Sequence, residues 1–306
     1  MITWGINSLN HGSSIAIFEN NKLIHWQFFT DDEIPKLDLE YFEFKFKPEH
    51  IYWYERPWLK KTRQAYAGQW SRVFSLEDIP KLWLKANKIH APITYTPHHG
   101  SHAAAGYYTS PFNHCAIVVL DAIGEWETMS IWEGKHGEIT KLWSNRYPQS
   151  LGLFYSAFTD LINLTPIKEE FKLQQLSEQG DRNRYLAEVL RRYNSNLHKG
   201  VQDWPYEVNP EDHKDIAAAV QFVFEIEVDS IMRKAKELTG SDSLVYMGGC
   251  AMNSKYNQQL VNHWKYVWSL PMPGDPSSAI GAVLYHTKNR EWDYKWNPVK
   301  HLEIKI

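Results

Sequence analysis

Short apolar stretches separated by polar turns open the chain and predict a start rich in β-structure. The first part then continues with alternating helical and strand patterns. Its predicted elements are strands over 2–6, 15–18 and 22–29, a helix over 31–46, a strand over 51–54, a largely helical segment over 58–88, a strand over 93–95 and a helix that begins at Pro97.

The second part repeats this order. Its predicted elements are strands over 114–121, 128–133 and 139–145, helices over 148–162, 167–192 and 210–239, a strand over 243–247, a helix over 251–261, a strand over 266–268 and a helix over 277–286. Three strands, helix, strand, helix, strand, helix thus occur twice, with extra helices in the second copy. The pattern predicts an α/β protein of two lobes, over 1–112 and 113–289, and a tail over 290–306 that packs on a lobe. A ligand is expected in the cleft between such lobes.

Composition supports a two-lobed protein inside the cell. With 306 residues, 43% of them hydrophobic, the chain is long for one core. No apolar run approaches the roughly 18 residues of a membrane span, and no signal peptide opens the chain. The two cysteines, Cys115 and Cys250, do not indicate a disulfide framework, which fits a reducing cytoplasm.

Three histidines between residues 98 and 102 are the strongest sign of chemistry. Thr96 can cap a helix there, and Pro97 suits its first position. His98 and His102 are then i and i+4, on one face, which is the spacing that suits two imidazoles on one metal ion. The alternative is a helix with exposed histidines beside a core strand.

Other turns carry residues that suit phosphate and cation binding. The first turn, with Asn7, His11 and Ser13 in or beside it, could hold phosphate through backbone N–H groups. The strand over 114–121 ends in Asp121 and continues to Glu125, an acidic turn that could face phosphates and their cations.

Charge is concentrated in one window. Residues 51–90 hold eight Lys or Arg against three acids, a charge of +5 that leaves −8 for the rest of the chain, and aromatic residues interleave with the basic ones. Cations with stackable rings are typical of a nucleic-acid groove, here with Arg56, Lys60, Lys61 and Arg63. The alternative is a solvated helix whose aromatic residues face the core.

Taken in order, these motifs resemble the O-carbamoyltransferase family and, more distantly, the threonylcarbamoyl-transfer proteins of tRNA modification. The motifs are GINSLNHGSSIAI, HHGSHAAAGYYTSPF, LDAIGEWET, YPQSLGLFYSAFT, EEFKLQQL, DIAAAVQ, MGGCAMNS and PGDPSSAIGA. The resemblance implies an actin-like, sugar-kinase-like (ASKHA) fold with an interlobe cleft. It also implies a divalent metal on His98, His102 and Asp275, with Fe(II) first and Mn(II), Mg(II) or Zn(II) as alternatives.

The same resemblance implies the other site residues. Gly248, Gly249 and Asn253 match the adenosine-binding turn, where glycines let the backbone approach a nucleotide. Lys172 matches a lysine that could meet phosphate. His11 and Asp121 match positions near the carbamoyl group; His11 is the candidate to deprotonate the acceptor hydroxyl, and Glu125 could do the same work or bind cation.

The implied activity is transfer of a carbamoyl group from carbamoyl-adenylate, made from carbamoyl phosphate and ATP, to a hydroxyl. Full family members carry a second domain that makes this adenylate, so either a separate carbamoyl-adenylate-forming protein supplies it or this chain does so itself. The basic window favours hydroxymethylcytosine in DNA as acceptor. The alternatives are a free nucleotide or small metabolite, threonylcarbamoyl transfer to tRNA, and a non-catalytic nucleotide-binding subunit.

Overall fold

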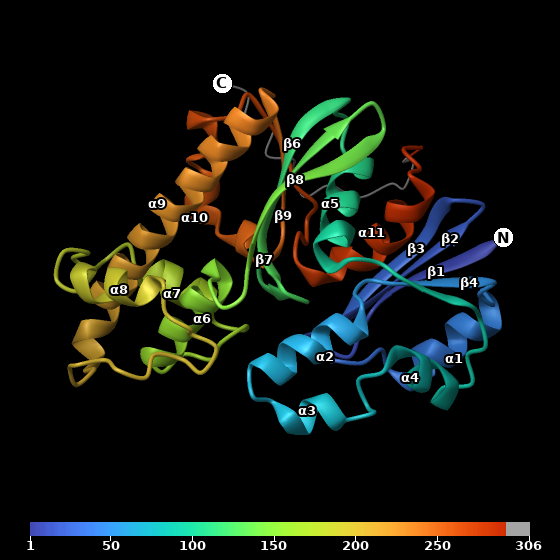
Figure 1. Ribbon diagram of the computed structural model, residues 1–306, viewed down its shortest axis with the longest axis horizontal. Helices are drawn as coiled ribbons and strands as arrows, with labels where there is room; N and C mark the ends of the chain where they lie inside the picture. The colour runs from blue at the N-terminus through green and yellow to red at the C-terminus, as the bar shows by residue number, and fades with distance from the viewer. Residues whose placement is uncertain (292–306) are drawn as a thin grey trace.

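The computed structural model describes residues 1–291, and its strands form two five-stranded mixed sheets (Figure 1). The first sheet has the order β3-β2-β1-β4-β5. Its strands β1 to β3 pair antiparallel, whereas β1, β4 and β5 pair in parallel. The elements of this half are β1 (Ile2–Asn7), β2 (Ser13–Glu19), β3 (Lys22–Phe29), α1 (Lys36–Lys45), β4 (His50–Trp53), α2 (Pro57–Tyr66), α3 (Trp70–Phe74), α4 (Pro80–Ala86), β5 (Ile93–Tyr95) and α5 (His98–Thr109).

The second sheet repeats the first, because its order β8-β7-β6-β9-β10 has the same pattern of antiparallel and parallel pairs. The predicted two-lobed α/β architecture is thereby confirmed. The elements of this half are β6 (His114–Gly124), β7 (Glu127–Lys135), β8 (Glu138–Arg146), α6 (Leu151–Leu161), α7 (Glu170–Leu176), α8 (Leu186–Tyr193), η1 (Pro210–Asp212), α9 (His213–Thr239), β9 (Ser243–Met247), η2 (Gly249–Met252), α10 (Ser254–Asn257), η3 (Leu260–Asn262), β10 (Tyr266–Trp268) and α11 (Asp275–Thr287).

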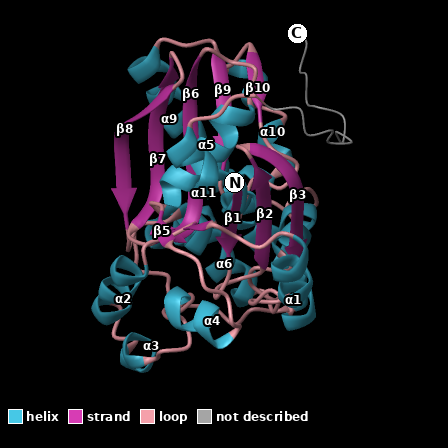
Figure 2. Cartoon of the chain, turned by 90° about the vertical axis from the view of Figure 1, so that its right-hand side faces the viewer, coloured by secondary structure: helices cyan, strands magenta, loops and turns pink. Residues whose placement is uncertain are grey.

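The last helix of each half lies between the two sheets and packs on the sheet of the other half (Figure 2). Helix α5 covers β6 and β9, α11 covers β1 and β2, and the two helices pack against each other. Small residues allow this approach: a Cβ on Gly281 would lie 1.7 Å from the carbonyl oxygen of Ser101. The crossing fixes the start of α5 relative to the start of α11.

Several predicted helices are shorter than the sequence pattern indicated. The segment over 58–88 divides into α2, α3 and α4, since Gly68 takes a left-handed φ of 73° and Pro80 starts a new helix. The segments over 167–192 and 251–261 also divide, and the helix over 31–46 begins only at Lys36. The predicted cap of α5 is wrong. Pro97 occupies the N-cap position, and Thr96 instead donates a hydrogen bond to the Ala282 carbonyl on α11.

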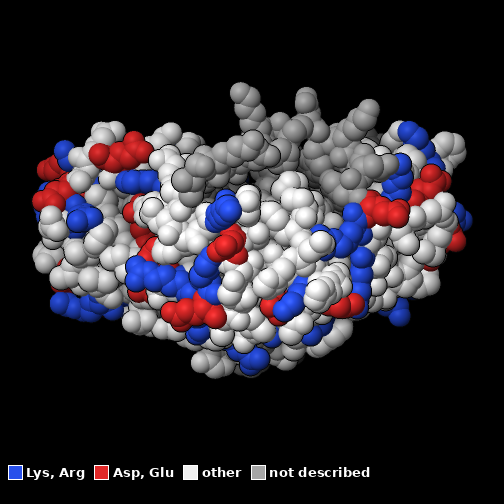
Figure 3. Space-filling view, turned by 90° about the horizontal axis from the view of Figure 1, so that it is seen from above, with Lys and Arg blue, Asp and Glu red and all other residues white. Residues whose placement is uncertain are grey.

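Three apolar clusters fill the molecule, one beneath each sheet and one around α5 and α11. In the described part of the chain, no helix is long and apolar enough to cross a bilayer. The face in Figure 3 carries acidic and basic side chains close together. The division into lobes at residue 112 stays a prediction, and the predicted tail lies outside the described residues from position 292 onward.

Candidate functional site

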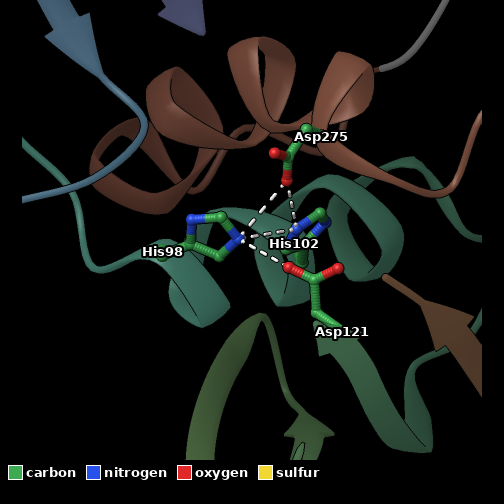
Figure 4. A group of neighbouring side chains, drawn as sticks. All are labelled: His98, His102, Asp121 and Asp275. Carbon is green, nitrogen blue, oxygen red and sulfur yellow. Dashed lines mark hydrogen bonds and ion pairs between the residues drawn. The ribbon is translucent and has the colours of Figure 1, made fainter. Parts of the chain in front are cut away.

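Two histidines and two aspartates meet where α5, α11 and β6 converge (Figure 4). His98 and His102 lie in the first turns of α5, Asp275 is the first residue of α11, and Asp121 is on β6. One ligand atom from each of these four side chains lies within 4.8 Å of the other three. The predicted histidine pair and Asp275, about 175 residues apart in the sequence, are thus neighbours because the two helices cross.

The ligand atoms have the spacing of donors to a single ion. His98 Nε2 lies 3.2 Å from His102 Nε2, and Asp275 Oδ1 lies 3.4 Å and 3.3 Å from these two nitrogens. Two ligand atoms each about 2.1 Å from one ion are about 3.0 Å apart in octahedral geometry and about 3.4 Å apart in tetrahedral geometry. His98 Nε2 and Asp121 Oδ2, at 3.1 Å, fit the same range. The four side chains can therefore share one cation.

Unused polar atoms at the cluster agree with this fit. Asp275 Oδ1 is buried and accepts no hydrogen bond from residues 1–291, although both histidines lie within ion-pair distance. A buried carboxylate oxygen without a donor is unfavourable, and a cation would satisfy it. The imidazole and carboxylate donors suit Fe(II), Mn(II) or Zn(II).

The electrostatics of the cluster also favour positive charge. Burial alone would lower the pKa of His98, but Asp275, Asp121 and Glu55 outweigh it and hold that pKa well above its ordinary value. Burial alone would raise the pKa of both aspartates, yet the charges of the neighbouring His98 and His102 outweigh it, together with the hydrogen bond from His98 to Asp121, so both carboxyls have a lowered pKa. The carboxylates thus stay ionised and attract positive charge.

Sequence reasoning missed a second layer around His98. Glu55, two residues after the end of β4, lies 3.8 Å from His98 Nδ1 through Oε2, while its Oε1 accepts a 2.8 Å hydrogen bond from Lys60 Nζ. The ring of Tyr54 lies 5.2 Å from that of His98. The sequence feature that could have pointed to Glu55 is its position: it is an acidic residue at the end of the strand predicted over 51–54, directly before Arg56-Pro57. His99 is outside the cluster and is hydrogen-bonded through Nδ1 to Ser130.

Asp121 connects the cluster to the turn predicted to meet adenosine. Its Oδ1 accepts a 3.3 Å hydrogen bond from the backbone N–H of Gly249. Gly248 is required beside it, because its φ is 92° and a Cβ would lie 2.2 Å from the Leu120 carbonyl oxygen. Asn253 does not face solvent. Its side chain caps α10 by accepting from Tyr256 N–H and pairs with Gln221 on α9.

A cavity of about 120 Å³ lies next to this turn, between α7, α9 and α10. Gln221, which pairs with Asn253, forms part of its wall. Cationic, aromatic and acidic side chains share the lining, and the guanidinium of Arg182 lies 3.9 Å from the ring centre of Phe222. The lining residues are Ser177, Gly180, Arg182, Ala218, Gln221, Phe222, Glu225 and Lys255.

The predicted phosphate residues lie in different environments. Asn7 and Ser13, at the facing ends of β1 and β2, are buried, and their side-chain polar atoms have no hydrogen-bond partner among the described residues. His11 is exposed in the connecting turn and makes none of the contacts that hold the metal cluster together. Lys172 is exposed on α7 and forms an ion pair with Glu169.

Glu125 is held by an arginine rather than left open for chemistry. Its Oε1 accepts from the backbone N–H of Arg56 at 2.7 Å, and the guanidinium binds both carboxylate oxygens at 2.5–3.2 Å. The pair joins the start of α2 to the turn between β6 and β7. The pair therefore links the two halves of the molecule, and the predicted catalytic role of Glu125 stays a prediction.

The four cations of the predicted nucleic-acid patch have internal contacts or are buried, so they do not form a free surface. Arg56 binds Glu125, and Lys60 is buried against Glu55. Lys61 binds Asp78 and the backbone carbonyls of Arg72 and Ser75. Arg63 is buried. The window is basic in sequence, but these charges are not presented to a polyanion.

Comparison with known proteins identifies related sequences. The family model described as carbamoyltransferase N-terminus matches residues 49–209 and 197–284. An uncharacterized protein of Synechocystis sp. is 30% identical over 292 residues, which covers 77% of this chain and 47% of that protein. The nodulation protein NolNO of Sinorhizobium fredii is 24% identical over 210 residues, covering 63% of this chain and 31% of that protein. The chain spans less than half the length of these curated relatives.

Solved structures share the fold at low identity. HypF, solved in its phosphate- and nucleotide-bound form, matches with a TM-score of 0.52 and 13% identity over 94% of this chain and 55% of that chain. The (R)-2-hydroxyglutaryl-CoA dehydratase component A of Acidaminococcus fermentans matches with a TM-score of 0.55 and 13% identity over 94% of this chain and 99% of that chain. These matches support the fold. The family model spans more than half of the sequence, and it shows that the chain belongs to the carbamoyltransferase family, whose N-terminal part it matches.

Proposed function

We propose that this chain transfers a carbamoyl group from carbamoyl-adenylate to an acceptor hydroxyl, at a divalent metal held by His98, His102 and Asp275. The observation that carries the proposal is the cluster at the crossing of α5 and α11, since its ligand atoms are spaced for one ion. Membership of the carbamoyltransferase family gives the reaction class. In this reaction the hydroxyl oxygen bonds to the carbamoyl carbon, the bond from that carbon to the phosphate oxygen breaks, and AMP leaves.

The metal and the residues around it have separate tasks. A bound divalent ion would act as a Lewis acid that stabilises negative charge on phosphate oxygens, and the family resemblance puts Fe(II) first. Asp121 is a fourth donor within reach, and its second oxygen orients the Gly249 N–H. Glu55 lies 3.8 Å from Nδ1 on the far side of the His98 ring, where it adds negative charge. Because the side chains that would hold the metal come from both halves, the chain fixes the position of the metal and, through it, the orientation of the leaving group.

We propose that the nucleotide lies against the turn at Gly248–Gly249, with its base toward the cavity between α7, α9 and α10. The turn lies close to the metal cluster, because the Gly249 N–H donates to Asp121, which adjoins the metal ligands. Asn253 supports the turn through its hydrogen bonds to Tyr256 and Gln221. Asn7 and Ser13 would meet phosphate with their unpaired polar atoms.

For the acceptor we propose His11 as the base that takes the hydroxyl proton, because it is exposed in the turn after β1. We propose two possible sources of carbamoyl-adenylate. Either this chain makes it from ATP and carbamoyl phosphate, or a separate adenylate-forming protein supplies it. The support for hydroxymethylcytosine in DNA is weakened, because Arg56, Lys60, Lys61 and Arg63 make internal contacts or are buried. It remains one acceptor to be tested beside free nucleosides, sugars and small hydroxy compounds.

The test is mass spectrometry for a gain of one carbamoyl group across a panel of hydroxyl acceptors. Reactions contain Fe(II), ATP and carbamoyl phosphate, with and without an adenylate-forming protein of the family. The matched control is His114→Ala, a histidine that pairs with Glu133 away from the cluster. We expect transfer by wild type and His114→Ala and a loss of at least about 100-fold in His102→Ala. Equal transfer by all three proteins would refute the role of the cluster.

A further inference from the structure

The buried face of α2 is polar, which is unusual for a helix packed into a protein interior. Lys60, Arg63 and Gln64, at i, i+3 and i+4, are only 7%, 9% and 4% exposed. The outward side of the same segment carries exposed aromatic residues such as Trp58 and Tyr66. The helix therefore directs Lys60 and Arg63 toward the protein interior.

Arg63 differs from the other cations of α2 and its start. Arg56 is paired with Glu125, Lys60 with Glu55 and Lys61 with Asp78. For the guanidinium of Arg63, no carboxylate lies within ion-pair distance among residues 1–291. Its one hydrogen bond runs from Nη1 to Gln69 Oε1 at 3.2 Å, and its Nε donates to no described atom.

The surroundings of Arg63 come from both halves and contain neutral polar groups. His198, in the loop after α8, is hydrogen-bonded through Nε2 to Gln69 at 2.8 Å, and its ring lies 5.8 Å from that of Tyr147. Burial, and then the charge of Arg63, lower the pKa of His198. The side-chain atoms Gln64 Oε1 and His198 Nδ1 are also buried without a partner in the described structure. Arg63, Gln69 and His198 thus connect α2 to this loop, and Arg63 and His198 each keep a buried polar atom without a described partner.

A buried cation without a counter-ion is unfavourable, because its lost hydration is not replaced. Such a group is stabilised when an anionic ligand enters and accepts its N–H bonds. Guanidinium groups suit carboxylate and phosphate in particular, since they offer parallel donors in a fixed plane. The unmet donor of Arg63 therefore indicates an oxyanion that residues 1–291 do not supply.

We propose that Arg63 anchors an oxyanion-binding subsite, and that the acceptor of carbamoyl transfer carries a carboxylate or phosphate group that binds there. This inference rests on the proposed function, because it assumes that the chain transfers a carbamoyl group to an acceptor. It adds the chemical class of that acceptor. The subsite is lined by Arg63, Gln64 and Gln69 from the first half and by Tyr147 and His198 from the second.

The position of Arg63 favours the acceptor over the nucleotide. It lies one helical turn from Lys60 on the same face of α2, and Lys60 is bonded to Glu55, which contacts His98. The cavity assigned to the nucleotide is lined by α7, α9 and α10 and has its own cations, Arg182 and Lys255. A small acceptor held at Arg63 by its anionic end could therefore direct its hydroxyl toward the metal cluster.

The test measures binding by calorimetry with ATP present at saturation. The probes are glycerol 3-phosphate and glycerate, with glycerol as the neutral control at matched ionic strength. The proteins are wild type, Arg63→Met, Arg63→Lys and the control Arg72→Met, which removes an exposed arginine on α3. We expect wild type and Arg72→Met to bind at least one anionic probe and not glycerol, Arg63→Met to bind it about 10- to 100-fold more weakly, and Arg63→Lys to lie between. Without probe, Arg63→Met should unfold at the same or a higher temperature than wild type.

Several outcomes would overturn the inference. Equal binding of the anionic probes by wild type and Arg63→Met would do so, as would failure of both anionic probes to bind wild type. If Arg63→Met instead weakened carbamoyl phosphate binding and left the acceptor probes unchanged, the oxyanion would belong to the donor. Because binding needs no turnover, Arg63-dependent binding with no carbamoyl transfer to any acceptor would refute the proposed function and leave the oxyanion subsite intact.

Discussion

A single methyl group at Gly281 should disrupt the metal site although it lies two helical turns from Asp275. An ideal Cβ there lies 1.7 Å from the carbonyl oxygen of Ser101, which is 1.7 Å short of the 3.4 Å at which ordinary contact begins. The obstacle is backbone, so no side-chain rotation relieves it. In Gly281→Ala, α11 must therefore move away from α5 near Ser101, which lies between His98 and His102.

The expected loss follows from this displacement. Overpacking typically costs about 1–3 kcal/mol, and we expect at least about 3 kcal/mol in the free energy of unfolding here because both helices are packed between sheets. The ligand atoms of Asp275 and the two histidines are already 3.3–3.4 Å apart. A further separation of about 1 Å exceeds what donors to one ion can span, so metal affinity should fall strongly.

The assay combines urea unfolding of the metal-free chain with metal analysis after dialysis against Fe(II) or Mn(II). The matched control is Gly240→Ala at the end of α9, where φ is 62° and a Cβ would meet nothing within 4 Å. Its left-handed backbone should cost about 1–2 kcal/mol without loss of metal. The reasoning is refuted if Gly281→Ala retains wild-type metal content and is no less stable than this control.

Three further predictions concern single side chains. His102→Ala should lose nearly all bound metal on elemental analysis while His114→Ala keeps it; full occupancy in the former would contradict the ligand assignment. Gly249→Val should weaken ATP binding strongly in calorimetry, because even the Cβ of an alanine there would lie 3.1 Å from Asp121 Oδ1 and valine adds two methyl groups. Gly249→Ala should weaken it less, and wild-type affinity in the valine variant would contradict the nucleotide position. Burial raises the pKa of Cys115 to about 12, so iodoacetamide at pH 8 should label this thiol only after unfolding. Any labelling of the folded protein should become faster as the pH rises, and rapid labelling at pH 8 would contradict this prediction.

The sequence allowed the metal ligands to be proposed because the information is local. His98 and His102 are one helical turn apart, so their common face follows from the helix alone. The repeated order of strands and helices likewise predicted two lobes, and the two sheets do repeat each other. Asp275 came only from the family resemblance, since no local pattern joins a residue at the start of α11 to the start of α5.

The basic window shows where sequence reasoning failed. A count of charges gives no partners, and the partners are spread along the chain. Lys60 binds an acid 5 residues away, Lys61 one 17 residues away and Arg56 one 69 residues away. Only the folded chain places the turn after β6 against α2. The same limit applies to Glu55, whose contact with His98 depends on the pairing of β4 with β1 and β5.

Helix boundaries failed for a different reason. The segment over 58–88 has helix-forming residues on both sides of Gly68, and periodicity alone does not reveal that this glycine takes a left-handed conformation. The cap of α5 failed because Thr96 donates its hydroxyl to Ala282 on α11, a tertiary hydrogen bond that competes with capping.

The central claim is that a metal held by His98, His102 and Asp275 supports carbamoyl transfer to a hydroxyl. Its most direct test is the mass of the acceptor after incubation with Fe(II), ATP, carbamoyl phosphate and an adenylate-forming protein. The account predicts a gain of one carbamoyl group with wild type and His114→Ala, and none with His102→Ala or after the metal has been removed by a chelator. Transfer that persists in His102→Ala and in the presence of chelator would contradict it.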